Sequence, residues 1–177
     1  LTGRWLAAGV VNINFAPVAD VNVRPSNPVI GIRSPGAFPS VVGDAVTGQV
    51  TGFDEAGVLS TAKHFPGHGD TELDSHGTLP RIHADQKTLW ERELVPYRLL
   101  AKEGIPAIMS GHLAFPATPG GQDPASLSRW FLTDLLRDRI GFKGLVITDD
   151  LMMNGATEAS GSLSRATKRA LEAGNDV

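Results

Sequence analysis

The sequence contains no cysteine among its 177 residues. Disulfide bridges, thiolate metal sites and a cysteine nucleophile are therefore excluded for this chain. It also lacks any apolar run near the roughly 20 residues that a membrane-spanning helix needs, so we expect no membrane-spanning segment. An excess of positive charge is missing too, because 16 lysines and arginines face 19 aspartates and glutamates, a net charge of −3. The chain is therefore not expected to bind nucleic acid.

The two ends of the chain do not resemble the ends of a complete protein. It begins with Leu1 inside an apparent helix and stops at Val177, where a helical pattern gives way to a strand pattern. No charged, apolar and cleavage-site regions of a signal peptide open it. We therefore expect a piece of a longer protein, which leaves localisation and oligomeric state open.

Short β-branched runs alternate with longer amphipathic stretches. The pattern predicts strands at residues 10–15, 58–64, 105–111 and 145–149, and helices at 40–56, 86–103, 128–140 and 162–173. Such alternation is typical of βαβ units with a parallel sheet. The strand runs are almost continuously apolar, as expected where helices cover both faces of a sheet. The sequence thus predicts a single α/β unit over residues 1–177.

Polar residues follow the predicted strands at or near their carboxyl ends. They are Asp20, His64, His112 and Asp149. Open α/β sheets and (β/α)₈ barrels both place active sites at that edge. A complete barrel takes about 250 residues, so four βα units would form about half of one.

The densest polar cluster is the stretch KHFPGHGD (residues 63–70), followed by DSH (74–76). Its glycines and proline predict a shaped loop rather than a helix. One interpretation is a metal site that uses His64, His68, Asp70, Asp74 and His76. Against this, the four-residue histidine spacing suits a helix, which the Pro66–Gly67 pair forbids.

The other interpretation of this cluster is acid–base catalysis. Asp74 and His76 are two residues apart, close enough for the carboxylate to hold the imidazole and stabilise its charged form. A histidine paired in this way transfers protons near neutral pH. Lys63 and His64, at a strand end, would face a substrate as hydrogen-bond donors.

Two further residues are candidates for chemistry. Asp149 directly follows a buried strand, where a carboxylate is costly unless it is used or paired. Its neighbour Asp150 is better explained as a cap for the turn that follows. Arg33 lies in a glycine- and proline-containing loop, and its planar guanidinium suits binding of a substrate oxygen.

Four motifs together resemble the bacterial β-N-acetylglucosaminidases of glycoside hydrolase family 3. They are NFAPVADV (14–21), PVIGIRS (28–34), KHFPGHGDT (63–71) with DSH (74–76), and GFKGLVITDDLM (141–152). They cover most of the chain in family order. The resemblance implies a (β/α)₈ barrel that releases terminal β-linked N-acetylglucosamine, from muropeptide or chitin fragments, by a retaining mechanism without a metal or cofactor.

The resemblance also implies a role for particular residues. Asp149 matches the nucleophile that forms the covalent glycosyl-enzyme. His76 matches the general acid/base, paired with Asp74. Arg33, Lys63 and His64 match residues that bind the sugar hydroxyls, so the expected partner is a small N-acetylglucosaminide.

The sequence departs from the family in one large respect. An upstream Asp-Gln-Glu-Gly-Gly-type motif, which contributes to the sugar pocket in the family, is missing. We therefore expect the chain to hold only strands four to seven of the barrel, and the isolated piece to be weakly active or inactive. Three alternatives stay open: a non-catalytic carbohydrate-binding fragment, a phosphorylase variant of the family, and a metal-assisted hydrolase.

Overall fold

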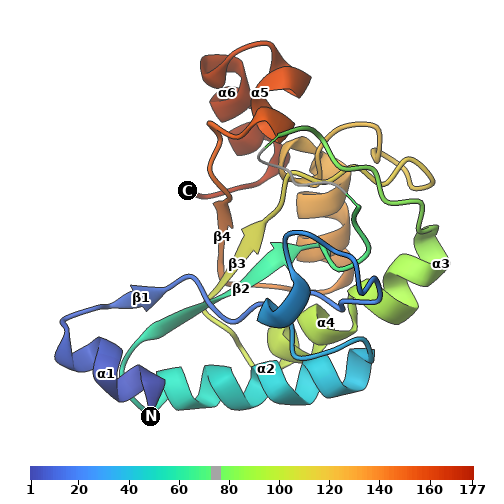
Figure 1. The fold of residues 1–177 in the computed structure, drawn as a ribbon. Helices are drawn as coiled ribbons and strands as arrows, with labels where there is room; N and C mark the ends of the chain where they lie inside the picture. Colours follow the sequence, from blue (N-terminus) through green and yellow to red (C-terminus); the bar gives the residue numbers. More distant parts are fainter. Residues whose placement is uncertain (73–76) are drawn as a thin grey trace.

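The computed structural model of this chain describes residues 1–72 and 77–177 (Figure 1). These residues form one parallel sheet, whose strands are β1 (Ile13–Asn14), β2 (Leu59–Phe65), β3 (Ala107–Ser110) and β4 (Leu145–Thr148). The strands lie side by side in chain order. That order advances in one direction, as in a (β/α)₈ barrel, whereas a doubly wound sheet reverses at a switch point. The predicted α/β class with a parallel sheet is confirmed, and within the described residues the sheet stays open.

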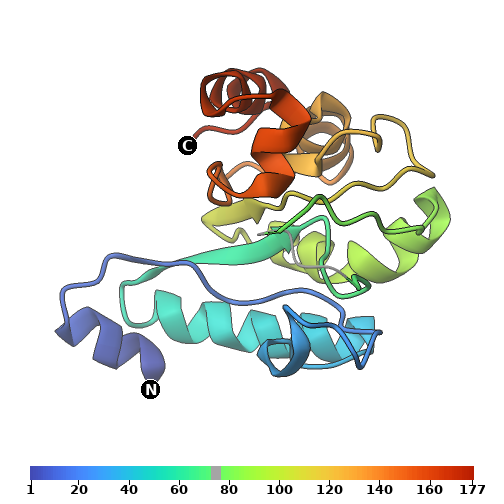
Figure 2. The same ribbon diagram turned by 45° about the horizontal axis from the view of Figure 1, so that its top comes forward.

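Helices connect the strands and cover the sheet. The α-helices are α1 (Thr2–Ala8), α2 (Pro39–Asp54), α3 (Gln86–Thr88), α4 (Val95–Lys102), α5 (Asn154–Ser160) and α6 (Leu163–Ala173), with π-helical segments at Leu89–Glu93 and Trp130–Arg139. In both ribbon views, α1 and α2 run along the lower side of the molecule and α5 and α6 lie at the upper side (Figure 1, Figure 2). Helix α2 packs against α4, and α5 packs against α6. No helix in the described part of the chain has the length and apolar character needed to cross a membrane.

The helix predicted at 86–103 is divided into three segments. Pro96 occupies the first turn of α4, where its missing N–H breaks no helical hydrogen bond, and a π-helical segment precedes it. The helix predicted at 128–140 is a π-helix over Trp130–Arg139. The predicted strand at 10–15 shrinks to Ile13–Asn14, and α5 was not expected from the sequence.

The core lies between the sheet and its helices. On α2, Val42, Val46 and Phe53 are spaced four and seven residues apart, so they share one buried face. From the sheet, Phe65 packs edge-to-face on Tyr97 of α4, with ring centroids 5.3 Å apart. Both rings are fully buried. This contact anchors the carboxyl end of β2, where the candidate site begins.

The β1 side of the sheet carries several exposed apolar side chains. They are Leu1, Trp5, Val10, Val11 and Phe15, of which Trp5 is 73% exposed. An open sheet edge beside exposed apolar side chains favours association with other chains.

Candidate active site

A buried carboxylate organises the carboxyl end of β2. Asp20 is completely buried, and its Oδ1 accepts hydrogen bonds from the backbone N–H groups of His64 (3.1 Å) and His68 (2.7 Å). Its Oδ2 lies 2.8 Å from Nδ1 of His64. Because an ionised carboxylate only accepts hydrogen bonds, Nδ1 of His64 carries the proton. Asp20 therefore fixes both the orientation of the His64 ring and the start of the following loop.

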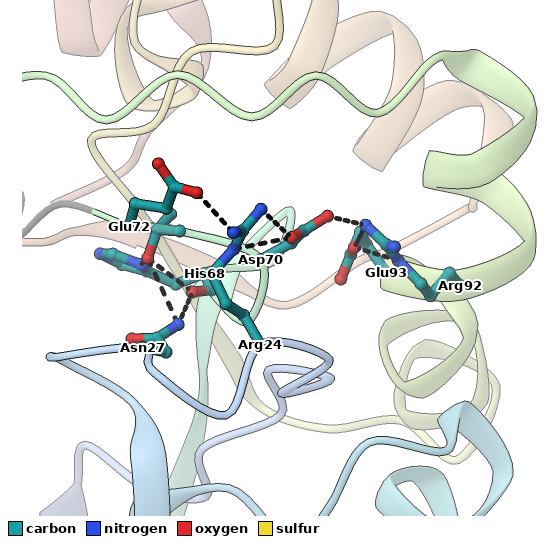
Figure 3. Close-up of polar contacts among 8 residues, drawn as sticks. Arg24, Asn27, His68, Asp70, Glu72, Arg92 and Glu93 are labelled. Atoms are coloured by element: carbon teal, nitrogen blue, oxygen red, sulfur yellow. Dashed lines mark hydrogen bonds and ion pairs between the residues drawn. The ribbon is translucent and has the colours of Figure 1, made fainter.

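Two glycines allow the loop to pack closely on the framework. A Cβ at residue 69 would lie 1.9 Å from the carbonyl oxygen of Val21, so only glycine fits there. Gly67 has φ +147°, and a Cβ there would lie 3.0 Å from Glu93. Asn27 holds the same loop, because its Nδ2 donates to the carbonyl of His68 at 2.9 Å (Figure 3). The Pro-Gly-His-Gly sequence thus encodes a loop shape.

Three charged groups lie around Lys63, near the end of β2. Burial lowers the pKa of Lys63 below its ordinary value, and the nearby positive charge of Arg33 lowers it further. The carboxylates of Asp149 and Asp20 oppose this shift, which shows that both lie within electrostatic reach of the ammonium group. Arg33 itself is exposed, in the 3₁₀ turn Gly31–Arg33.

Asp149 follows β4 directly and is only partly buried. Its backbone N–H donates to the carbonyl of Ser110 on β3 (3.0 Å), so the neighbouring strand fixes its position. Its Oδ1 accepts a hydrogen bond from the backbone N–H of Asp150 at 2.9 Å. The carboxylate thus lies at the carboxyl edge of the sheet, where it is accessible to a ligand.

His112 supports the turn that follows Asp149. Its Nε2 lies 3.0 Å from the carbonyl oxygen of Asp150, and its Nδ1 lies 2.7 Å from Oγ of Ser126. Burial lowers the pKa of His112, which favours the neutral ring. Since a carbonyl only accepts, Nε2 carries the proton and Nδ1 accepts from the Ser126 hydroxyl. His112 therefore positions the backbone next to Asp149.

The structure brings four of the six predicted site residues to one edge of the sheet. Lys63 and His64 lie at the end of β2, Asp149 follows β4, and Arg33 approaches Lys63 from the loop before α2. The other two, Asp74 and His76, lie outside the described residues. Immediately after them, the carbonyl of Gly77 accepts a hydrogen bond from Nδ2 of Asn154 (3.4 Å), at the start of α5.

The supporting residues were only partly evident from the sequence. Asp20 and His112 stand near strand ends in the sequence, but that pattern does not predict their partners. Asn27 and Asn154 gave no signal beyond being polar residues in loops. Within residues 1–72 and 77–177, no three histidine, aspartate or glutamate side chains are placed to share a metal ion.

Comparison with known proteins gives a consistent result. The family model "Glycosyl hydrolase family 3 N terminal domain" matches residues 2–177. The Beta-hexosaminidase A of Pseudoalteromonas piscicida is 39% identical over 186 residues, which cover 99% of this chain and 31% of that protein. Among solved structures, a glycoside hydrolase family 3 beta-N-acetylglucosaminidase from Paenibacillus sp. str. FPU-7 superposes with a TM-score of 0.94 at 42% identity, covering 99% of this chain and 33% of that one.

A third relative is NagZ from Neisseria gonorrhoeae, solved in complex with N-trifluoroacetyl-D-glucosamine. It superposes with a TM-score of 0.89 at 34% identity, covering 99% of this chain and 49% of that one. The chain thus spans about a third to a half of the length of these relatives. It belongs to the N-terminal domain family of glycosyl hydrolase family 3.

Proposed function

We propose that this chain forms the nucleophile-bearing part of a barrel domain in a β-N-acetylglucosaminidase that acts by retention. The observation that carries the proposal is the gathering of Asp149, Lys63 and Arg33 at the carboxyl edge of a parallel sheet. The sugar is suggested by the relatives, whose names are Beta-hexosaminidase and beta-N-acetylglucosaminidase. Substrates would be small N-acetylglucosaminides, such as muropeptide or chitin fragments.

Asp149 is the proposed nucleophile. Its carboxylate would attack the anomeric carbon as the glycosidic C–O bond breaks, giving a covalent glycosyl-enzyme that water then hydrolyses. Lys63 lies within electrostatic reach of this carboxylate, which opposes the lowering of the pKa of Lys63 by burial. Attack on the anomeric carbon also requires access from solvent, and the partial exposure of Asp149 supports this role.

His76, paired with Asp74, is the proposed general acid/base. It would donate a proton to the departing oxygen in the first step and remove a proton from water in the second. The hydrogen bond between Gly77 and Asn154 supports this assignment, because it ties the residue after His76 to the segment that follows Asp149.

Lys63, His64 and Arg33 are the proposed ligands of the sugar hydroxyls. Asp20 occupies Nδ1 of His64, which leaves Nε2 of the ring for a substrate oxygen. The guanidinium of Arg33 is exposed, and its one hydrogen bond among the described residues is from Nη1 to the carbonyl of Val29 at 3.2 Å. Its remaining N–H groups suit a pair of neighbouring hydroxyls.

The test is hydrolysis of 4-nitrophenyl β-N-acetylglucosaminide by the full-length protein. Asp149→Asn is expected to abolish turnover while sugar binding persists. Asp150→Asn is the matched control, since Asn keeps the acceptor that caps Met152. Binding without turnover in the wild type would favour the carbohydrate-binding alternative. Formation of N-acetylglucosamine 1-phosphate in phosphate buffer would favour the phosphorylase, and loss of activity with chelator the metal-assisted hydrolase.

A further inference from the structure

A series of charged side chains, linked by ion pairs, holds the loop after β2 (Figure 3). Asp70 lies at its centre. Its Oδ2 is 2.6 Å from Nη2 of Arg92, and its Oδ1 is 3.2 Å from Nη2 of Arg24. Arg24 comes from the segment between β1 and α2, and Arg92 from the π-helical segment Leu89–Glu93. Each carboxylate oxygen is thus held by an arginine from a different part of the fold, and we call these three residues the Asp70 clamp.

The ion pairs of the clamp differ in their exposure to solvent. The side chains of Asp70 and Arg92 are 21% and 25% exposed, and Glu93, which also pairs with Arg92, is fully buried. Glu72, in contrast, contacts Arg24 but is 71% exposed. Exposed pairs contribute little because water screens them, whereas shielded pairs are costly to break. Of the two ion pairs on Asp70, the one with Arg92 is therefore the more shielded and the more costly to break.

The buried Glu93 supports the same loop through its contacts with Gly67 and Arg92. It packs under Gly67, where a Cβ would lie within 3.0 Å of its Cβ and its Oε2. Its Oε1 accepts from Nε of Arg92 at 2.6 Å. The guanidinium that binds Asp70 is therefore held in place by a buried group.

We propose that Asp70 is a positioning residue for the proposed acid/base pair. Arg24 and Arg92 hold Asp70 in place, so that the segment leading to this pair starts from one defined position. The inference rests on the proposed function. Asp74 and His76 follow Asp70 by four and six residues in the sequence. Beyond them, the Asn154–Gly77 hydrogen bond ties the chain to the segment after Asp149. Releasing Asp70 removes the charged fixed point on the near side and leaves the hydrogen bonds of Thr71 to Asn27 and His68 there.

The test compares two substrates in the full-length enzyme. In a 2,4-dinitrophenyl glycoside, the dinitrophenolate departs without acid assistance. Cleavage of N,N′-diacetylchitobiose instead needs a proton on the departing oxygen. Asp70→Asn keeps the shape but removes the charge that binds both arginines. We expect kcat/KM for the chitobiose to fall about 10- to 100-fold, because misplacement of a proton donor by about 1 Å has effects of that size. For the dinitrophenyl glycoside we expect kcat/KM to change by about twofold or less, since its first step needs no proton from the proposed general acid.

Azide gives an independent readout of the second step. It attacks the glycosyl-enzyme without needing a general base, so it is expected to restore kcat of Asp70→Asn on the dinitrophenyl glycoside. A purely structural defect would not respond to azide. Glu72→Gln is the matched control, because it removes a neighbouring but exposed carboxylate, and it is expected to match the wild type on both substrates.

The outcomes separate the inference from the proposed function. Equal losses on both substrates, or no loss, would overturn the positioning role of Asp70. If Asp70→Asn does not fold, Arg92→Gln breaks the same contact from the other side and must show the same selectivity for the poor leaving group. A His76→Ala variant with full activity on both substrates would overturn the proposed acid–base role, and with it the inference.

Discussion

Replacing the buried Glu93 with Gln is expected to change how stability depends on pH. Burial raises the pKa of Glu93 from 4.5 to about 7, and the charges of Asp70 and Asp20 add to the increase, while Arg92 opposes it with a smaller effect. The folded state therefore binds the proton more tightly than the unfolded state. The difference of about 2.5 in pKa, at about 1.4 kcal/mol for each, corresponds to about 3 kcal/mol.

The sign of the effect follows from the direction of the pKa change. Below pH 4.5 the group is protonated in both states and its stabilising contribution is fully present. As the pH rises from 4.5 through about 7, the unfolded state ionises first, so this contribution is lost. Above that range the contribution no longer changes with pH.

Denaturant unfolding of the full-length protein at several pH values between 4.5 and 8 measures this contribution. The free energy of unfolding of the wild type minus that of Glu93→Gln is expected to fall by about 3 kcal/mol as the pH rises across this range. The reason is that Gln mimics the neutral acid and does not titrate. The exposed Glu72→Gln is the control, and its profile should parallel the wild type. A Glu93→Gln profile that also parallels the wild type would contradict the raised pKa of Glu93.

Two further predictions follow from the loop and from the turn after β4. Gly69→Ala is expected to destabilise the protein by about 3 kcal/mol or more, because the new Cβ would lie 1.9 Å from the carbonyl oxygen of Val21; Gly48→Ala, on an open helix face, is its control, and equal melting temperatures for the two variants would contradict the close approach. His112→Ala is expected to lower the free energy of unfolding by about 1–3 kcal/mol, because it leaves the buried Ser126 hydroxyl and the Asp150 carbonyl without their partner. Replacement of the exposed His83 by Ala should have almost no effect on the free energy of unfolding. If His112→Ala is as stable as His83→Ala, these hydrogen bonds contribute nothing.

Much of the fold followed from local sequence patterns. β-branched apolar runs placed β2, β3 and β4, and the spacing of Val42, Val46 and Phe53 agrees with the predicted helix α2. Apolar spacing does not distinguish an α-helix from a π-helix, so the hydrogen-bond pattern of Trp130–Arg139 was not predictable. Helix α5 is short, and its polar and small residues give little periodic signal.

The candidate site followed from the sequence only in part. Strand-end positions pointed to Lys63, His64 and Asp149, because parallel strands bring their carboxyl ends to one edge. The contacts that hold these residues join segments far apart in sequence. Asp20 and His64 are 44 residues apart, and Arg24 and Asp70 are 46 apart. Such pairs depend on how the loops pack on the folded sheet, which no local pattern encodes.

Asp149 is the residue proposed to form a covalent bond to the sugar, and mass spectrometry of the labelled protein detects that bond. The full-length enzyme would be incubated with a 5-fluoro analogue of N-acetylglucosaminyl fluoride, whose electron-withdrawing fluorine slows hydrolysis of the intermediate. We expect an added fluorosugar on the peptide that contains Asp149, and none in Asp149→Asn. A sugar on another residue, or turnover that inverts the anomeric configuration, would contradict this role of Asp149.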